Sequence, residues 1–180
     1  MDDPAIIEPA QALSRWSVRM RPQDCAAWEG ILGLSLPTKP LRSHSSEAGS
    51  ALWLGPDEWL LLMPAQSARA FRDRYSRATP APPASIVDIS QRNAGFTLRG
   101  AHIRWILNSG CPLDLGEIAF PPGACTRTLY HKAEIVLWRR DDVPSRSRGA
   151  VWHLECWRSF APYVEASLAR AAAEWAAENV

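Results

Sequence analysis

The stretch that decides the fold is Ile86–Leu115, which reads IVDISQRNAGFTLRGAHIRWILNSGCPLDL. Its first four residues are mostly apolar and predict a short buried strand, and residues 96–99 alternate apolar and polar side chains as a half-buried strand does. A turn at 91–94 would join these strands. Apolar side chains then recur at helical spacing over 103–107, until the Gly-Cys-Pro sequence at 110–112 ends the helix. Strand, turn, strand and helix therefore follow each other within this one stretch.

Similar units are expected on the N-terminal side. Residues 1–12 lack periodicity and predict a loose segment, and the polar residues 43–49 suggest a strand end or a hairpin loop. A proline-rich linker over 79–83 leads into the central stretch. The regular elements predicted between them are a strand at 14–20 with a basic outer face, a helix at 22–32, a hairpin of strands at 51–54 and 59–63, and a helix at 66–77.

The C-terminal side predicts a hairpin, a last strand and a last helix. The hairpin strands at 125–130 and 134–138 close around His131-Lys132, and 151–156 alternates as a strand. Ser159 is placed to cap the final helix. Residues 139–149, rich in Arg, Asp and Ser, are expected to be mobile.

The order βα, ββα, ββα, βββα predicts the fold class. It indicates an α+β domain over residues 13–180, with helices packed on a mainly antiparallel sheet. A loose duplication of the ββα unit fits this order. No heptads or low-complexity tracts are present.

Composition excludes several classes of function. The chain is 47% hydrophobic and 22% charged, as is usual for a globular protein. Its net charge of +1 comes from 20 basic and 19 acidic residues spread along the chain, which gives no footprint for nucleic acid or an acidic membrane. No apolar run is long enough to span a bilayer, and the acidic start is unlike a secretion signal, so a cytoplasmic location is expected.

The cysteines and tryptophans carry further information. Four cysteines lie far apart with no C-x-x-C pair, which predicts reduced thiols and no metal site. Nine tryptophans favour an interface, because Trp is enriched at binding hot spots as well as in cores. Cys111 follows a helix end, where no helix dipole lowers its pKa, so a packing role is preferred over a nucleophile.

Motifs that mark common enzyme classes are absent. The sequence has no G-x-G-x-x-G, P-loop, H-E-x-x-H or G-x-S-x-G. Three acidic residues remain as candidates. Asp88 and Asp114 are interpreted as turn residues that accept backbone N–H groups, with ligand orientation as the alternative for Asp88. Glu134 is interpreted as one half of a surface ion pair.

Five segments, in order, resemble the gamma subunit family of heterotetrameric sarcosine oxidase. The likeness covers about residues 13–175, and the matching segments are ALWLGPDEWLL at 51–61, VDIS at 87–90, SGCPLDL at 109–115, AFPPGAC at 119–125 and RSFA at 158–161. The resemblance implies a subunit without a flavin of its own. It also implies alpha, beta and delta partner subunits that hold FAD, FMN and NAD, with tetrahydrofolate accepting the one-carbon unit from sarcosine.

The family is also similar in fold to the folate-binding domain of aminomethyltransferases. By that resemblance, VDIS at 87–90 corresponds to an Asp-Val-Ser-His opening in which Gln91 replaces the His. The glycines and acidic pair of a later aminomethyltransferase strand are replaced here by HKAE at 131–134. The resemblance therefore leaves Asp88 and Glu134 as the residues that would contact folate.

Three functions follow as hypotheses. The first is a structural and assembly subunit of a sarcosine oxidase, not catalytic by itself, with an interface at or supported by Trp53, Pro56, Trp59, Cys111 and Pro112. The second is a free-standing, tetrahydrofolate-binding one-carbon protein that uses Asp88 and Glu134. The third is a diverged homo-oligomer.

Overall fold

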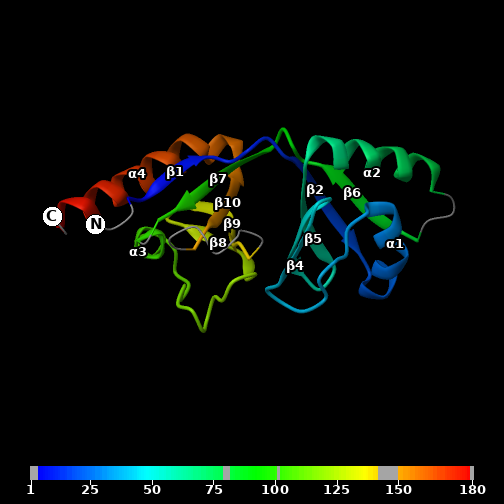
Figure 1. Ribbon diagram of the computed structural model, residues 1–180, viewed down its shortest axis with the longest axis horizontal. Coiled ribbons are helices and arrows are strands. Elements are labelled where there is room, and N and C mark those ends of the chain that lie inside the picture. Colours follow the sequence, from blue (N-terminus) through cyan, green and yellow to red (C-terminus); the bar gives the residue numbers. More distant parts are fainter. Residues whose placement is uncertain (1–3, 79–81, 101, 142–149, 179–180) are drawn as a thin grey trace. The chain divides into compact units, whose positions relative to one another are not determined.

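The computed structural model describes residues 4–78, 82–100, 102–141 and 150–178. The chain forms two compact units (Figure 1). One unit consists of residues 12–91, and the other combines residues 1–11 with residues 92–180. The region 13–180, expected to be one domain, therefore contains two hydrophobic cores.

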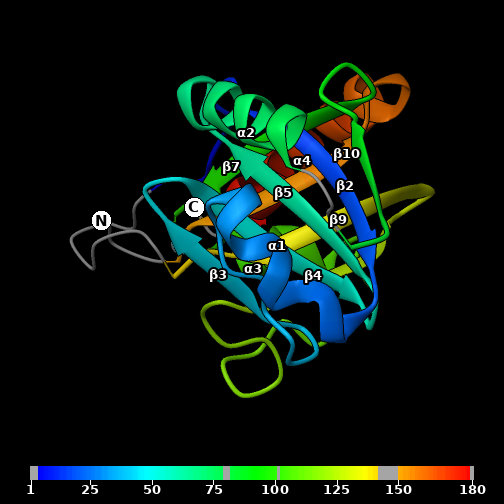
Figure 2. The same cartoon turned by 90° about the vertical axis from the view of Figure 1, so that its right-hand side faces the viewer.

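The unit of residues 12–91 has one antiparallel sheet of five strands in the order β3-β4-β5-β2-β6 (Figure 2). Two helices, α1 and α2, contribute to its core, and a short 3-10 turn at Pro22–Asp24 leads into α1. The elements are β2 (Ser14–Met20), α1 (Cys25–Leu32), β3 (Ser43–Ser46), β4 (Gly49–Gly55), β5 (Glu58–Met63), α2 (Ala65–Arg77) and β6 (Ala84–Asp88).

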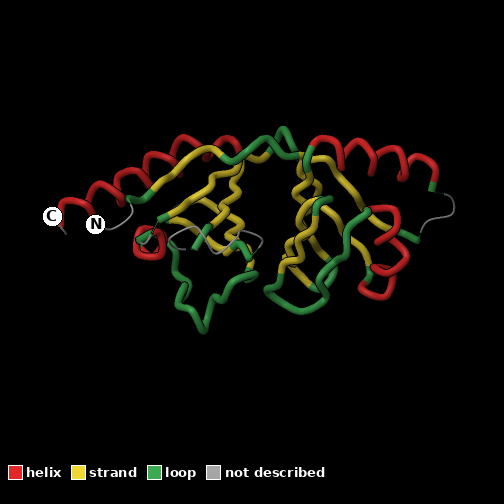
Figure 3. The backbone as a smooth tube through the Cα atoms, in the orientation of Figure 1, coloured by secondary structure: helices red, strands yellow, loops and turns green. Residues whose placement is uncertain are grey.

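The second unit also has an antiparallel sheet of five strands, in the order β1-β7-β10-β9-β8. Helices α3 and α4 contribute to its core, and Figure 3 shows α4 running along the strands. A 3-10 turn at Arg158–Phe160 precedes α4. The elements are β1 (Ile6–Pro9), β7 (Asn93–Arg99), α3 (Ile103–Asn108), β8 (Cys125–Tyr130), β9 (Ala133–Arg139), β10 (Trp152–Trp157) and α4 (Ala161–Glu178).

The two units share one topology. In the first unit the elements follow as β2, α1, β3, β4, β5, α2 and β6, and in the second as β7, α3, β8, β9, β10 and α4. Among the described residues of the second unit no strand follows α4, and β1 takes the corresponding edge position beside β7. The duplication expected from the sequence is therefore present as a repeated topology.

Each core lies on one face of its sheet, because alternate strand residues and the apolar stripes of two helices meet there. In the first unit Val18 and Leu61 face Trp28 and Phe71. The core of the second unit includes Phe96, Leu98, Ile106, Leu137, Leu154, Val164 and Leu168. None of the described helices has the length and apolar character needed to cross a membrane.

Several local expectations differ from the structure. Residues 6–9 of the segment expected to be loose form β1, which pairs with β7. A turn at residues 90–92 joins β6 and β7, close to the expected position, but the two strands lie in different sheets, because β6 pairs with β2. Alternation identifies a strand but not its partner. Ser159 lies within the 3-10 turn before α4. Residues 142–149 of the segment expected to be mobile lie outside the described residues.

Candidate functional site

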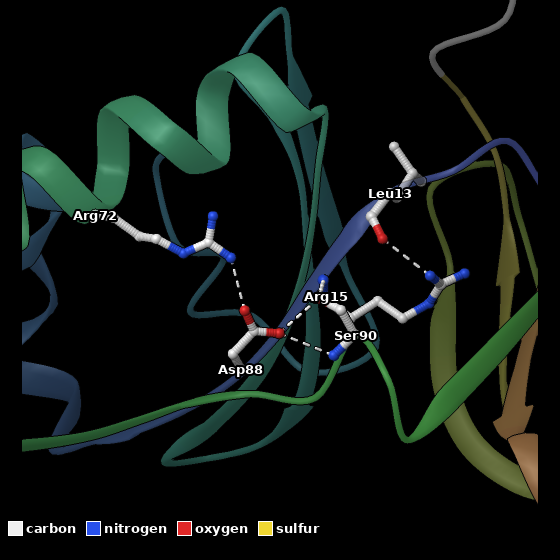
Figure 4. A network of polar contacts seen from close by, with 5 residues as sticks. All are labelled: Leu13, Arg15, Arg72, Asp88 and Ser90. Carbon is white, nitrogen blue, oxygen red and sulfur yellow. Dashed lines mark hydrogen bonds and ion pairs between the residues drawn. The ribbon is translucent and has the colours of Figure 1, made fainter.

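A polar network surrounds Asp88 at the end of β6 (Figure 4). The Ser90 hydroxyl donates to Asp88 Oδ1 at 2.6 Å, and the Ser90 backbone N–H donates to the same oxygen at 2.9 Å. The other oxygen, Oδ2, accepts a hydrogen bond from Arg72 Nη2 at 2.7 Å. The carboxylate is therefore held by its own chain on both oxygens.

Ser90 connects this carboxylate to β2. Its hydroxyl oxygen accepts the Arg15 backbone N–H at 2.9 Å, and the Ile89 N–H donates to the Arg15 carbonyl at 2.8 Å. The Arg15 guanidinium in turn donates to the Leu13 carbonyl at 2.9 Å (Figure 4). An Asp followed two residues later by a bonded Ser is an Asx-type turn. The network thus joins the end of β6 to the start of β2.

Arg72 brings helix α2 to the same point. Its guanidinium carbon lies 4.9 Å from the ring centroid of Trp16, a cation–π distance. The Trp16 ring meets Phe71 edge-on at 4.9 Å between centroids. The helix periodicity that places Phe71 in the core therefore also places Arg72 over Trp16 and against Asp88.

The pKa of Asp88 is lowered from its ordinary value of 3.8. Partial burial alone would raise the pKa, but the hydrogen bonds from Ser90, together with the hydrogen bond and positive charge of Arg72, outweigh that effect. The Asp88 carboxylate accepts three hydrogen bonds from Ser90 and Arg72, which fixes the turn that follows β6 and its contact with α2. The geometry supports the turn-residue interpretation of Asp88.

Asp88 is expected to make folding stability depend on acid pH. A lowered folded-state pKa means that its contribution is present above the ordinary value of 3.8 and is lost as pH falls through that value toward the folded pKa. The difference in free energy of unfolding between wild type and Asp88→Asn, measured by urea titration, should therefore shrink between pH 6 and pH 3. The effect is small because the side chain is 37% exposed. A difference that stays constant over this range would contradict the assignment.

Glu134 lies in the other unit and is exposed. Its Oε1 is 3.8 Å from Arg127 Nε, across the β8–β9 hairpin. Exposed pairs at this distance contribute under about 1 kcal/mol. The contacts of Asp88 and Glu134 therefore tie each carboxylate to its own unit.

The residues expected at an interface fall into two groups. Pro56, in the β4–β5 turn, and Pro112 are exposed, and Trp53 is half-buried. Trp59 is 0% exposed and its Nε1–H donates to the Pro37 carbonyl at 2.8 Å. Trp59 and Cys111 are both buried, each within its own unit, so neither belongs to the exposed surface.

The Cys111 turn is held against the β8–β9 hairpin. The His131 N–H donates to the Gly110 carbonyl at 2.8 Å, and the hydroxyls of Ser109 and Tyr130 lie 3.4 Å apart. All four cysteines are free and buried. Among the residues that the structure describes, no three His, Cys, Asp or Glu side chains gather as metal ligands.

Two polar pairs with buried members, His153–Glu155 and Arg139–Glu117, were not predicted from the sequence. His153 Nε2 lies 2.8 Å from Glu155 Oε1, and both residues are almost fully buried on β10. Arg139 is also buried, and its Nη2 donates to both oxygens of Glu117 at 2.7 Å. Residues i and i+2 of a strand lie on the same face, so the spacing of His153 and Glu155 in the predicted strand could have indicated that they lie close together.

The profile of the family described as "Sarcosine oxidase, gamma subunit family" matches residues 19–174. A sarcosine oxidase subunit gamma from Arthrobacter sp is 31% identical over 115 residues, which cover 63% of this chain and 56% of that protein. Another from Corynebacterium sp. (strain P-1) is 28% identical over 156 residues, covering 86% and 72% of the two chains. The alignments with the Arthrobacter protein and with a similar one from Corynebacterium sp. (strain U-96) span just over half of each relative's length.

Two solved structures have a similar fold. One is a heterotetrameric sarcosine oxidase from Corynebacterium sp. U-96 in complex with pyrrole 2-carboxylate, with a TM-score of 0.79 and 21% identity over 94% of this chain and 84% of that chain. The other is the glycine cleavage system aminomethyltransferase T from Bartonella henselae, with a TM-score of 0.64 and 14% identity over 92% and 45% of the two chains. The second likeness confirms the expected aminomethyltransferase-like α+β fold.

Proposed function

The chain belongs to the sarcosine oxidase gamma subunit family, and on that premise we propose that it is the small, assembly-promoting subunit of a heterotetrameric sarcosine oxidase. In this proposal the alpha, beta and delta partner subunits hold FAD, FMN, NAD and tetrahydrofolate and oxidise sarcosine to glycine. The observation that carries the proposal is the family match over residues 19–174, which includes most of both units.

The candidate folate contacts do not fit an independent folate site. Asp88 already accepts three hydrogen bonds from Ser90 and Arg72, and exposed Glu134 lies near Arg127. A carboxylate that binds the pterin ring of folate accepts hydrogen bonds from its N–H groups, whereas both Asp88 oxygens already accept hydrogen bonds from within the chain. The proposal therefore assigns folate chemistry to a partner subunit.

Exposed aromatic residues support an assembly role. Trp157, Phe160 and Tyr163 follow each other at intervals of three at the end of β10 and the start of α4, and each is more than a third exposed. The segment contains RSFA at 158–161, one of the stretches on which the resemblance to the family rests. Exposed aromatic side chains are typical of protein interfaces. We assign this segment, with the exposed turns at Pro56 and Pro112, to contacts with the larger subunits.

Charge substitutions at these surfaces are expected to block assembly. In cells that co-express all four subunits, with a tag on this chain, Tyr163→Glu and Pro56→Glu should each reduce the co-purified larger subunits by about tenfold or more, because a buried unpaired carboxylate is costly. Matched controls are Ala173→Glu, exposed on the same helix, and Pro83→Glu, an exposed proline outside the turns.

The same experiment separates folding from assembly. Circular dichroism of each purified variant should match that of the wild type, since all four positions are exposed or partly exposed. Normal recovery of the larger subunits with both Tyr163→Glu and Pro56→Glu would overturn the assignment of these surfaces.

A further inference from the structure

A cavity of about 290 Å³ opens in the unit of residues 12–91, where the segment after α1 leads into β3. Its lining comes from residues 35–39 and 42–44. The polar lining consists of the nitrogen-bearing side chains of Lys39, Arg42 and His44 and the hydroxyl side chains of Ser35, Thr38 and Ser43. No Asp or Glu lines the cavity. Its wall is therefore rich in hydrogen-bond donors and carries no fixed negative charge.

The basic side chains of this cavity have no acidic partners. Within the described parts of the chain, the side chains of Lys39, Arg42 and His44 make no ion pair and no hydrogen bond. By contrast, seven other arginines have an acidic residue within ion-pair distance, namely Arg19, Arg21, Arg72, Arg99, Arg127, Arg139 and Arg170. Lys39 and Arg42 thus line the same cavity without an acidic partner, in a chain whose net charge is only +1.

A turn at residues 39–42 brings Lys39 and Arg42 to the opening of the cavity. Pro40 is followed by Leu41, whose φ of 59° lies in the left-handed region. Pro at the second position and a positive φ at the third are the features of a type II turn, in which the first and fourth Cα atoms lie within about 7 Å. Lys39 and Arg42 are the first and fourth residues. A non-glycine residue with positive φ is uncommon and strained, and such strain clusters at functional sites.

The floor of the cavity is anchored to the core. Leu36 is buried, and the Pro37 carbonyl accepts the indole N–H of Trp59 at 2.8 Å. Glu29 lies behind this wall, where its two oxygens accept the Ser35 hydroxyl at 3.2 Å and the Leu36 N–H at 3.4 Å. The wall is therefore fixed before any ligand arrives, which lowers the ordering cost of binding.

We propose that this cavity binds a small molecule through a phosphate or carboxylate group, with Lys39 and Arg42 as the charged contacts and His44 and the Thr38 hydroxyl as additional donors. Arg and Lys form short, charge-assisted hydrogen bonds with both oxyanions. The volume lies near the lower end of the usual range for ligand pockets, about 300–1,000 Å³, which suits a small metabolite. This inference does not depend on the proposed oxidase function.

Isothermal titration calorimetry of the full chain tests the proposal, with inorganic phosphate and succinate as separate probes at constant ionic strength. At least one probe should bind saturably, and phosphate alone would indicate a phosphorylated ligand whereas succinate alone would indicate a carboxylic acid. Lys39→Gln and Arg42→Gln should each weaken binding by about tenfold, because each removes a charge-assisted contact.

The control is Lys132→Gln, which removes the other lysine of the chain from the exposed β8–β9 turn. This variant should bind the probe with wild-type affinity, and all three variants should keep the wild-type melting temperature because the substituted side chains are exposed. Failure of both probes to bind saturably, or equal affinity in the Lys39→Gln/Arg42→Gln double variant, would overturn the proposal.

Discussion

Trp59→Ala is expected to destabilise the fold by about 3–5 kcal/mol, a large fraction of the roughly 5–15 kcal/mol by which folded proteins are typically stable. Trp59 is fully buried on β5 and packs among the core residues of its unit. Truncation would leave a large cavity and would also leave the Pro37 carbonyl without its indole donor. Urea unfolding followed by circular dichroism measures the loss.

Two variants sharpen this prediction. Trp59→Phe keeps most of the buried ring and loses the indole N–H, so its cost should be clearly smaller than that of Trp59→Ala. Trp105→Ala is the matched control, because the Trp105 ring on α3 is 44% exposed and its removal should cost less than about 1 kcal/mol. Equal costs for Trp59→Ala and Trp105→Ala would contradict the core position of Trp59.

Gly49→Ala is expected to destabilise by about 2–4 kcal/mol, because backbone strain and a steric clash add together. Gly49 has a φ of 137°, and a Cβ built there lies 2.4 Å from the Leu62 carbonyl oxygen. That neighbour is backbone of the adjacent strand β5, so it cannot turn aside as a side chain would. The register of β4 against β5 would have to shift.

Gly30→Ala provides the opposite case within the same unit. Gly30 lies inside α1, and a Cβ built there meets no atom within 4 Å. Alanine in a helix interior is better than glycine by about 0.5–1 kcal/mol, so this variant should be stabilised. The two melting temperatures should therefore move in opposite directions. A stable Gly49→Ala protein would contradict the close packing of β4 on β5.

Much of the fold followed from periodicity. The alternation at Trp16, Val18 and Met20 predicted β2, and the hairpin around Pro56-Asp57 was found as predicted. These patterns are local, because one buried face imposes a period of two on a strand. The resemblance to the gamma subunit family was confirmed by the family profile and the curated relatives.

Strand partners could not be predicted in the same way. The strand β1 is short, and its pairing with β7 joins residues about 90 positions apart in sequence. The sheet change between β6 and β7 leaves no mark in the pattern, since both strands would look the same in a hairpin. Pairing depends on which apolar faces meet in three dimensions, and a single sequence does not encode that locally.

The conformation of two turns could not be predicted from the sequence either. Leu41 and His131 both have positive φ, at 59° and 51°, where glycine or asparagine is the usual signal. The contacts that hold these turns come from distant residues, such as the Gly110 carbonyl that accepts the His131 N–H. For the same reason Asp88 was interpreted as a turn residue, whereas its contact with Arg72, on the helix predicted at 66–77, was not predicted.

We propose that this chain assembles with the larger subunits of a sarcosine oxidase. The most direct measurement is affinity purification of the tagged wild-type chain from its native host, followed by the visible spectrum of the eluate and an assay of sarcosine-dependent peroxide formation. We expect larger subunits, flavin absorbance and oxidase activity to co-purify with the chain. A colourless eluate that contains only this chain would contradict it.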